Sequence, residues 1–140
     1  MKKPVKIIIC GSRSFNDYQF LERTVREVFR NLTQQGILYG SPAKDAEIIE
    51  IISGGAQGAD ILGEWFAQQY GLWVKVMLAD WDKNGKQAGI IRNCEMVDYV
   101  ADSDCYGMVI AFWDGESKGT QHCFNYAKDK KLDVRIRLFR

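Results

Sequence analysis

The stretch EIIEIISGGAQGADILGEWFAQQYG, from Glu47 to Gly71, decides the fold. It opens on an apolar, β-branched run, Glu47 to Ile52, which predicts a strand. The segment from Asp60 to Tyr70 predicts a helix that ends at Gly71, because glycine is common just past helix ends. Between the two lies the glycine-rich octapeptide SGGAQGAD, Ser53 to Asp60, whose last residue is in position to cap the helix. A strand, a tight turn and a helix in this order form the repeating unit of a parallel α/β sheet.

The same unit recurs along the whole chain. Further apolar runs predict strands over four segments: Val5 to Cys10, Leu72 to Leu78, Tyr106 to Trp113 and Asp133 to Phe139. Helical spacing of apolar residues predicts three more helices: Asp17 to Leu32, with Asp17 placed to cap it, Ala88 to Ala101, and Thr120 to Lys131. This alternation predicts a single α/β domain over residues 1–140. Its core is a doubly wound parallel sheet in the order 3-2-1-4-5, with helices on both faces.

Two connections are longer than the others. The first, Thr33 to Ala46, is expected to be a surface excursion, and the second, Ala79 to Gln87, follows the third strand. Connections of this length in a compact domain are often functional or mobile.

Composition narrows the classes of function. The chain has 140 residues, of which 46% are hydrophobic, and a formal net charge of +1. This balance disfavours a strongly basic nucleic-acid surface, so nucleic acid is not expected as the main partner. No apolar run approaches the roughly twenty residues of a membrane span, and none forms a signal peptide, so a cytoplasmic location is expected. The four cysteines lack metal-ligand spacing, so we expect free thiols, no metal and no cofactor.

The loops after the strands carry the candidate site. Ligands of such sheets bind beyond the carboxyl ends of the strands, at the point where the winding reverses. Three of these loops, GSRSF, SGGAQGAD and WDGESKGT, are rich in glycine and serine, which lets backbone N–H groups approach an anion at a helix N-terminus. The alternative is a set of tight turns whose glycines only allow close packing. The phosphate interpretation selects these residues: Gly11, Ser12, Arg13, Ser53, Gly54, Gly55, Gly58, Asp60, Gly115, Ser117, Gly119 and Thr120.

Four further side chains add to this set, Trp81, Arg92, Asn93 and Asp114, and Arg13 within it has two interpretations. Arg13 could pair with a phosphate or form a surface salt bridge. Trp81 could cover a base or fill its own loop. Arg92 and Asn93, near the start of the third of the four main predicted helices, are placed to face the crevice, and Asp114 could bind a ribose or hold its loop.

Five motifs in this order resemble one known family. They are GSRSF, SGGAQGAD, ADW at Ala79 to Trp81, AGIIRN at Ala88 to Asn93, and WDGESKGT at Trp113 to Thr120. Together they are similar to the YspA-like, cpYpsA-related branch of the SLOG superfamily, which includes DprA and the LOG phosphoribohydrolases. The resemblance implies a Rossmann-like fold and a nucleotide-type ligand at these loops.

The resemblance also bears on catalysis. LOG enzymes cleave the N-glycosidic bond of nucleoside monophosphates with a helix arginine and a glutamate. The arginine matches Arg92, but the glutamate position falls on Cys123, and a thiol does not replace a carboxylate in this reaction. Asp114 and Glu116, from the same loop, are the candidate substitutes, so Arg92, Asp114 and Glu116 form the candidate catalytic set.

Three functions therefore stay open: binding or sensing of a nucleotide-derived ligand, hydrolysis of a nucleoside monophosphate, and single-stranded nucleic-acid binding as in DprA relatives. SLOG relatives commonly pair, so a homodimer is expected as well. Its predicted contact surface is the apolar part of the helix Ala88 to Ala101, formed by Ile90, Ile91, Met96, Val97, Tyr99 and Val100.

Overall fold

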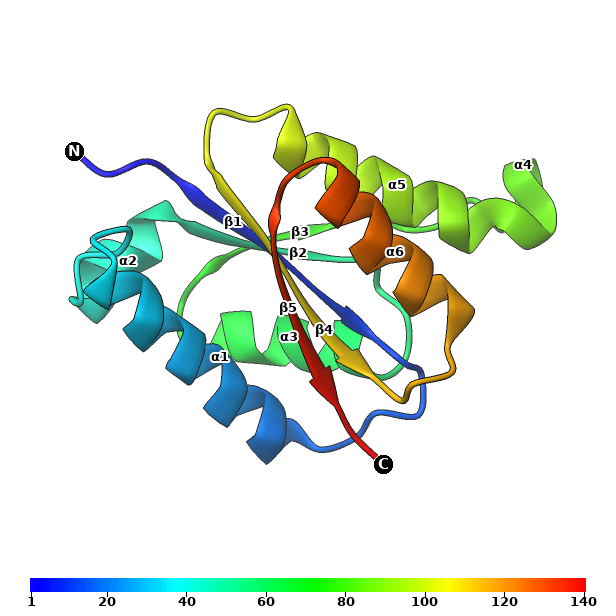
Figure 1. Cartoon of the computed structure of the whole chain (residues 1–140), viewed down its shortest axis with the longest axis horizontal. Helices are drawn as coiled ribbons and strands as arrows, with labels where there is room; N and C mark the ends of the chain where they lie inside the picture. Colours follow the sequence, from blue (N-terminus) through cyan, green and yellow to red (C-terminus); the bar gives the residue numbers. More distant parts are fainter.

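The fold is built on one sheet of five parallel strands. The computed structural model describes residues 1–140, and its sheet has the order β3-β2-β1-β4-β5 (Figure 1). The strands are β1 (Val5–Gly11), β2 (Ile49–Ser53), β3 (Trp73–Val76), β4 (Tyr106–Trp113) and β5 (Asp133–Leu138). The predicted doubly wound α/β sheet and its strand order are confirmed.

Helices cover both faces of this sheet (Figure 1). On one face lie α1 (Tyr18–Gln34) and α3 (Ala59–Gln69), and on the other α5 (Ala88–Ala101) and α6 (Lys118–Asp129). Strand β1 contributes side chains to the hydrophobic core on both faces of the sheet. Ile7 and Ile9 pack under α1 and α3, while Ile8 and Cys10 pack under α5 and α6. Burial on both faces explains why this strand is continuously apolar. None of the helices combines the length and the apolar composition that crossing a membrane requires.

The two expected helix caps differ in outcome. The Asp17 cap of α1 is confirmed, since the Asp17 carboxylate accepts a hydrogen bond from the Phe20 N–H at 3.0 Å. The expected Asp60 cap of α3 is wrong: Gly58 holds the N-cap position, and Asp60 lies within the first turn. The Asp60 carboxylate turns back instead and accepts the N–H of Ala56 at 3.2 Å.

The two long connections contain short helices. The second strand begins at Ile49 rather than at Glu47, because α2 (Pro42–Ile48) occupies the end of the predicted surface excursion. Pro42 favours the first turn of this helix, and Asp45 fixes the preceding chain by accepting the N–H groups of Tyr39 and Gly40. The segment after β3 folds into α4 (Trp81–Asn84) and a 3₁₀ turn, Gly85–Gln87.

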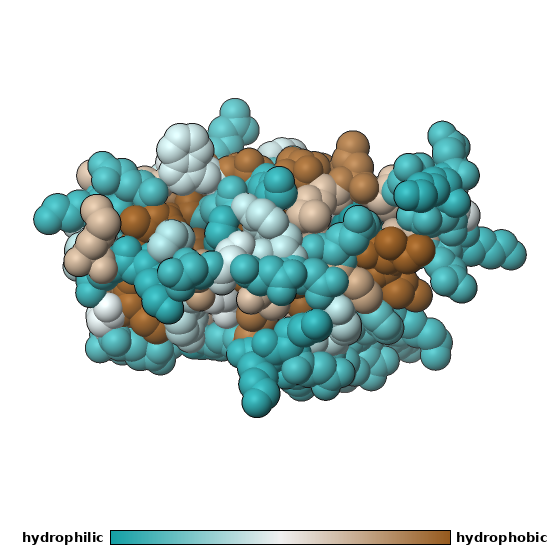
Figure 2. Space-filling view, turned by 90° about the horizontal axis from the view of Figure 1, so that it is seen from above, coloured by the Kyte–Doolittle hydropathy of each residue, from teal (hydrophilic) through white to brown (hydrophobic).

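Helix α5 has the predicted bounds but not the predicted contact surface. Met96, Val97 and Val100 are buried against the sheet of the same chain, and the Tyr99 hydroxyl donates a hydrogen bond to Glu50 on β2. Only Ile90, 42% exposed, remains as an exposed large hydrophobic side chain of the six expected. Figure 2 shows this side of the molecule, where hydrophilic residues predominate and hydrophobic ones form separate patches. Half of the predicted pairing surface is therefore wrong, because Met96, Val97 and Val100 belong to the core and cannot contact a partner.

Candidate functional site

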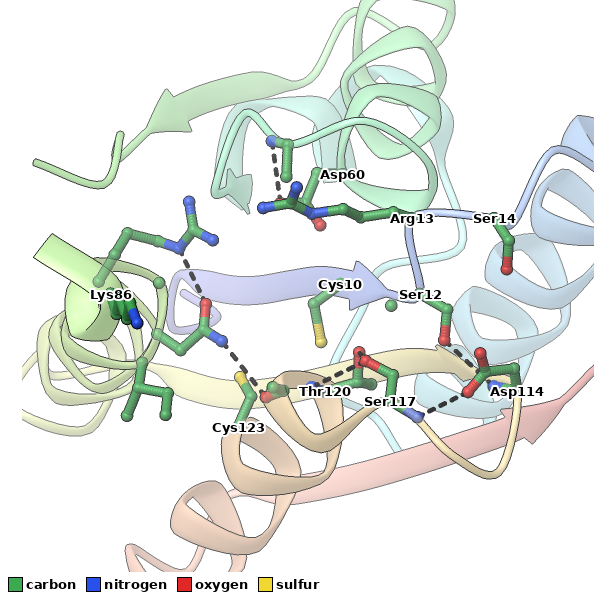
Figure 3. Close-up of a pocket in the computed structure, with 17 residues that line it drawn as sticks. Cys10, Ser12, Arg13, Ser14, Asp60, Lys86, Asp114, Ser117, Thr120 and Cys123 are labelled. Atoms are coloured by element: carbon green, nitrogen blue, oxygen red, sulfur yellow. Dashed lines mark hydrogen bonds between the residues drawn. The ribbon is translucent and has the colours of Figure 1, made fainter. Parts of the chain in front are cut away.

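The loops at the carboxyl ends of β1, β2 and β4 meet around a cleft of about 500 Å³ (Figure 3). Its walls come from the β1–α1 loop, the start of α3, the first turns of α5 and the β4–α6 loop. Most of the residues selected from the sequence line it: Gly11, Ser12, Arg13, Asp60, Arg92, Asn93, Asp114, Ser117, Gly119 and Thr120. The structure thus brings segments from both halves of the chain to one place.

A second, smaller cavity adjoins this cleft. Its volume is about 330 Å³, and it shares Arg13, Ala56 and Arg92 with the cleft as a common wall. Three further residues selected from the sequence line this side cavity: Gly54, Gly55 and Trp81. The last four line neither space: Ser53, Gly58, Gly115 and Glu116.

The β1–α1 loop is fixed by a serine and presents an arginine. Ser12 is buried; its N–H donates to the Phe112 carbonyl at 3.0 Å, and its hydroxyl accepts the N–H of Asp114 at 3.2 Å. These bonds hold the loops after β1 and β4 together. Arg13 is exposed and has no ion pair within the protein, so its guanidinium is available to an anion.

Some polar groups of the octapeptide Ser53 to Asp60 form hydrogen bonds within the protein, and others stay free. Ser53 is fully buried, and its hydroxyl contacts Glu64 at 2.6 Å while accepting the N–H of Gly55 at 3.0 Å. Ser53 therefore holds the turn and does not face the cleft. The N–H groups of Gly54 and Gln57 make no hydrogen bond within the protein and stay available to a ligand.

Gly54 makes room for two opposite charges. A Cβ at this position would lie 2.7 Å from both the Arg92 Cζ and the Asp60 Oδ2, so any side chain would push the two groups away. Arg92 comes from α5, where its Nη1 donates to the Gly54 carbonyl at 2.6 Å and its Nε to the Asn93 Oδ1 at 2.8 Å. Two of its donors are thus committed, and the guanidinium is held beside Asp60.

Asp60 has an unusual carboxyl group. It is buried, and this loss of hydration raises its pKa from 3.8 to about 6, against the opposing effects of the Ala56 N–H, Arg92 and Arg13. The nearby Glu64 raises the pKa further. A carboxyl group of this kind can hold or release a proton close to neutral pH.

Asp114 is the opposite case. Its Oδ1 accepts the N–H groups of Ser117 and Glu116 at 2.8 and 2.9 Å, and these bonds lower the pKa of its exposed carboxyl. It therefore stays ionised and lines the cleft as a fixed negative charge. Glu116 is exposed and lies outside both spaces, so Asp60 and Asp114 are the two carboxylates that line the cleft.

The start of α6 forms the polar floor opposite Arg13 (Figure 3). Ser117 is the N-cap, and its hydroxyl lies 3.1 Å from the Thr120 Oγ1 and 3.5 Å from the Thr120 N. The N–H groups of Lys118 and Gly119 make no hydrogen bond, and nothing lies within 4 Å of where a Gly119 Cβ would stand. Free amides and hydroxyls at the positive end of a helix favour an anion.

Several lining residues were missed from the sequence: Cys10, Ser14, Ala56, Lys86, Gly89, Ile90 and Cys123. Lys86 adds a third cation from the long loop after β3. Cys10 and Cys123 both line the cleft, and the neighbouring Cys123 thiol together with burial raises the pKa of the Cys10 thiol. Lys86 lies in a long loop that the sequence marks as a candidate for function, and the family resemblance already places Cys123 at the position of the catalytic glutamate. Cys10, inside an apolar strand, gave no indication. No group of three or more acidic, cysteine or histidine side chains is placed to hold a metal ion.

Comparisons with known proteins identify the family and the fold. The sequence model of the YAcAr family, described as the YspA, cpYpsA-related SLOG family, matches residues 5–84. The chain is 35% identical to the Gene 61 protein of Mycobacterium phage D29 over 134 residues, which cover 92% of this chain and 93% of that protein. Its fold is similar to the X-ray structure of DNA processing protein A (DprA) from Streptococcus pneumoniae, with a TM-score of 0.60 and 16% identity over 96% of this chain. The match spans 50% of the DprA chain, and at this identity it shows the fold alone.

Proposed function

Because this chain belongs to the YspA, cpYpsA-related SLOG family, we propose that it binds a phosphorylated ribose or a nucleotide in the cleft at the carboxyl edge of its sheet. The observation that carries the proposal is Arg13, a cation with no ion pair in the protein that lines both the cleft and the side cavity.

The rest of the lining supports an anionic, hydroxyl-rich ligand. Arg13, Lys86 and Arg92 face two carboxylates, Asp60 and Asp114, so the cleft carries a net positive charge. The hydroxyls at the start of α6 and the free amides there can bind phosphate oxygens, as helix N-termini do elsewhere. We place the phosphate between this end of the cleft and the Arg13 guanidinium, and the sugar beside the wall that Arg13 and Arg92 form.

Replacing Arg13 by alanine tests the proposal. Isothermal titration with ribose 5-phosphate is expected to show binding to the wild type and a loss of about tenfold to a hundredfold in the variant, the range of a hydrogen bond to a charged group. Arg23→Ala is the matched control, because Arg23 is also exposed but lies on α1 and lines no part of the cleft. Equal affinity in the two variants contradicts the assignment.

A second candidate is hydrolysis of the N-glycosidic bond of a nucleoside monophosphate. The observation that favours it is Asp60, whose pKa of about 6 suits proton transfer near neutral pH. In this reaction water adds across the bond, so that the sugar gains a hydroxyl and the base gains a proton. Of the two glutamate substitutes expected from the sequence, Asp114 lines the cleft as an ionised carboxylate that can stabilise positive charge on the sugar, whereas Glu116 lies outside both spaces. Chromatography of AMP after incubation is expected to show free adenine with the wild type and none with Asp60→Asn.

We also propose a homodimer, through a surface other than α5. Strand β3 is at an edge of the sheet, and its Trp73, Val74 and Val76 are 66%, 40% and 44% exposed. An apolar edge with unpaired backbone groups favours pairing with a second copy.

Sedimentation velocity at tens of micromolar is expected to show a dimer for the wild type. Val74→Lys is expected to give a monomer, because a charge on an edge strand prevents strand pairing. Lys75→Arg, on the same strand, is the control and keeps the dimer. A monomeric wild type contradicts this proposal and leaves the ligand proposal untouched.

A further inference from the structure

We propose that the side cavity beside the cleft binds the flat ring of a nucleobase, so that a ribonucleoside 5′-monophosphate lies across both spaces. The inference deepens the proposed function and rests on it, because the side cavity is reached from the sugar position at the shared wall.

The two spaces adjoin each other. Arg13, Ala56 and Arg92 line both of them, so a ligand that lies along these three residues reaches from the cleft into the side cavity. In a nucleoside monophosphate the phosphate, the ribose and the base follow one another along the molecule. With the phosphate at the start of α6 and the ribose at the shared wall, the base enters the side cavity.

The side cavity offers an apolar surface on the outer side. Leu78 and Trp81 line it and are 72% and 51% exposed, although both are large hydrophobic residues. The Trp81 ring lies beside the start of α5, where its Cη2 is 3.6 Å from the position that a Cβ on Gly89 would occupy. Leu78 packs on Gly55, whose φ of +70° and lack of a side chain let the Leu78 Cδ2 come within 2.5 Å of its Cβ position. An exposed indole beside a cavity is a stacking surface for a base.

Hydrogen-bonding groups lie on the inner side. The free N–H groups of Gly54 and Gln57 belong to residues that line the side cavity and can donate to the acceptors on a base edge. No carboxylate lines this cavity, in contrast to the cleft, which contains Asp60 and Asp114. A neutral, flat ring with acceptors on its edge therefore fits the side cavity, and the charged parts of the ligand fit the cleft.

The test compares ligands with and without a base. Titration of the wild type with ribose 5-phosphate and with each of AMP, GMP, CMP and UMP is expected to give at least one nucleotide about tenfold tighter than ribose 5-phosphate, the range of one stacked base. Trp81→Ala is expected to remove this preference while leaving the affinity for ribose 5-phosphate unchanged, and Trp81→Phe to restore most of it. Trp65→Ala is the matched control, since Trp65 is 56% exposed on α3 and lines neither space.

Each of the other possible outcomes contradicts the inference for a different reason. Equal affinity for ribose 5-phosphate and for all four nucleotides shows that the base makes no contact. A parallel loss for both ligand types in folded Trp81→Ala, as judged by circular dichroism, shows that Trp81 only supports the loop. A change from dimer to monomer in Trp81→Ala, with the nucleotide preference intact, assigns the cavity to a second copy of the chain. If no phosphorylated ligand binds the wild type, the proposed function falls together with the inference.

Discussion

Gly11→Ala is expected to lower the free energy of unfolding by about 3 kcal/mol or more, enough to leave little folded protein at moderate temperature. Gly11 ends β1 and pairs with Phe112 on β4. A Cβ there would lie 2.2 Å from the Phe112 carbonyl oxygen and 2.9 Å from the Ala59 Cβ. The first contact is with backbone inside the sheet, so neither partner can move aside without breaking the pairing of the two central strands.

Thermal unfolding followed by circular dichroism measures this effect, and a fall in Tm of about 10 °C or more is expected. The matched control is Gly119→Ala, because nothing lies within 4 Å of that Cβ position and the residue is in the first turn of α6. Alanine favours helix there, so the control is expected to match or slightly exceed the wild type. Similar behaviour of the two variants would mean that β1 and β4 are not packed as described.

The strand order follows from the sequence because it depends on few choices. Continuous apolar runs at Val5–Gly11 and Tyr106–Trp113 require cover on both faces, which makes these two strands central. With right-handed crossovers and short connections, the remaining strands then take the order 3-2-1-4-5. The start of β2 could not be predicted from the sequence, because Glu47 and Ile48 fit a strand as well as they fit the end of α2.

Side-chain roles within the loops depend on tertiary partners that spacing does not reveal. Ser53 and Ser12 are both serines next to glycine, yet one bonds to Glu64 inside the fold and the other joins two loops at the cleft. Glu116 is close in sequence to Asp114, but the bonds of the Asp114 carboxylate to the next amides turn the loop, and Glu116 faces solvent.

The glycines of SGGAQGAD illustrate the same limit. The sequence left open whether they admit a ligand or only close packing. A Cβ on Gly58 would lie 2.5 Å from the Ser12 carbonyl oxygen, and its φ is +94°, so this glycine serves the packing of two loops. Gly54 and Gly55 are also packed closely, but they line the side cavity as well. Close packing therefore explains Gly58, whereas Gly54 and Gly55 combine close packing with a place in the wall of the side cavity.

Asp60→Asn is expected to stabilise the protein at pH 8 by up to about 3 kcal/mol and to have almost no effect at pH 4. Raising the pKa of this buried carboxyl from 3.8 to about 6 corresponds to a cost of roughly that size for the ionised form. The folded state binds more protons than the unfolded state between these two pKa values. The stability of the wild type therefore falls as pH rises from about 4 to 6 and is constant above, as far as Asp60 is concerned.

The variant removes this dependence because asparagine is neutral at every pH and keeps an oxygen that can accept the Ala56 N–H. Urea unfolding at pH 4, 5, 6, 7 and 8 measures the difference between variant and wild type, which is expected to grow through this range and level off near pH 7. Asp82→Asn, which removes an exposed carboxylate on α4, is the control and is expected to show no such growth. A constant difference across the range would mean that Asp60 is ionised throughout and held by Arg92 and Arg13. In that case burial is not the dominant influence on its charge, and the carboxylate is a fixed partner of the two arginines.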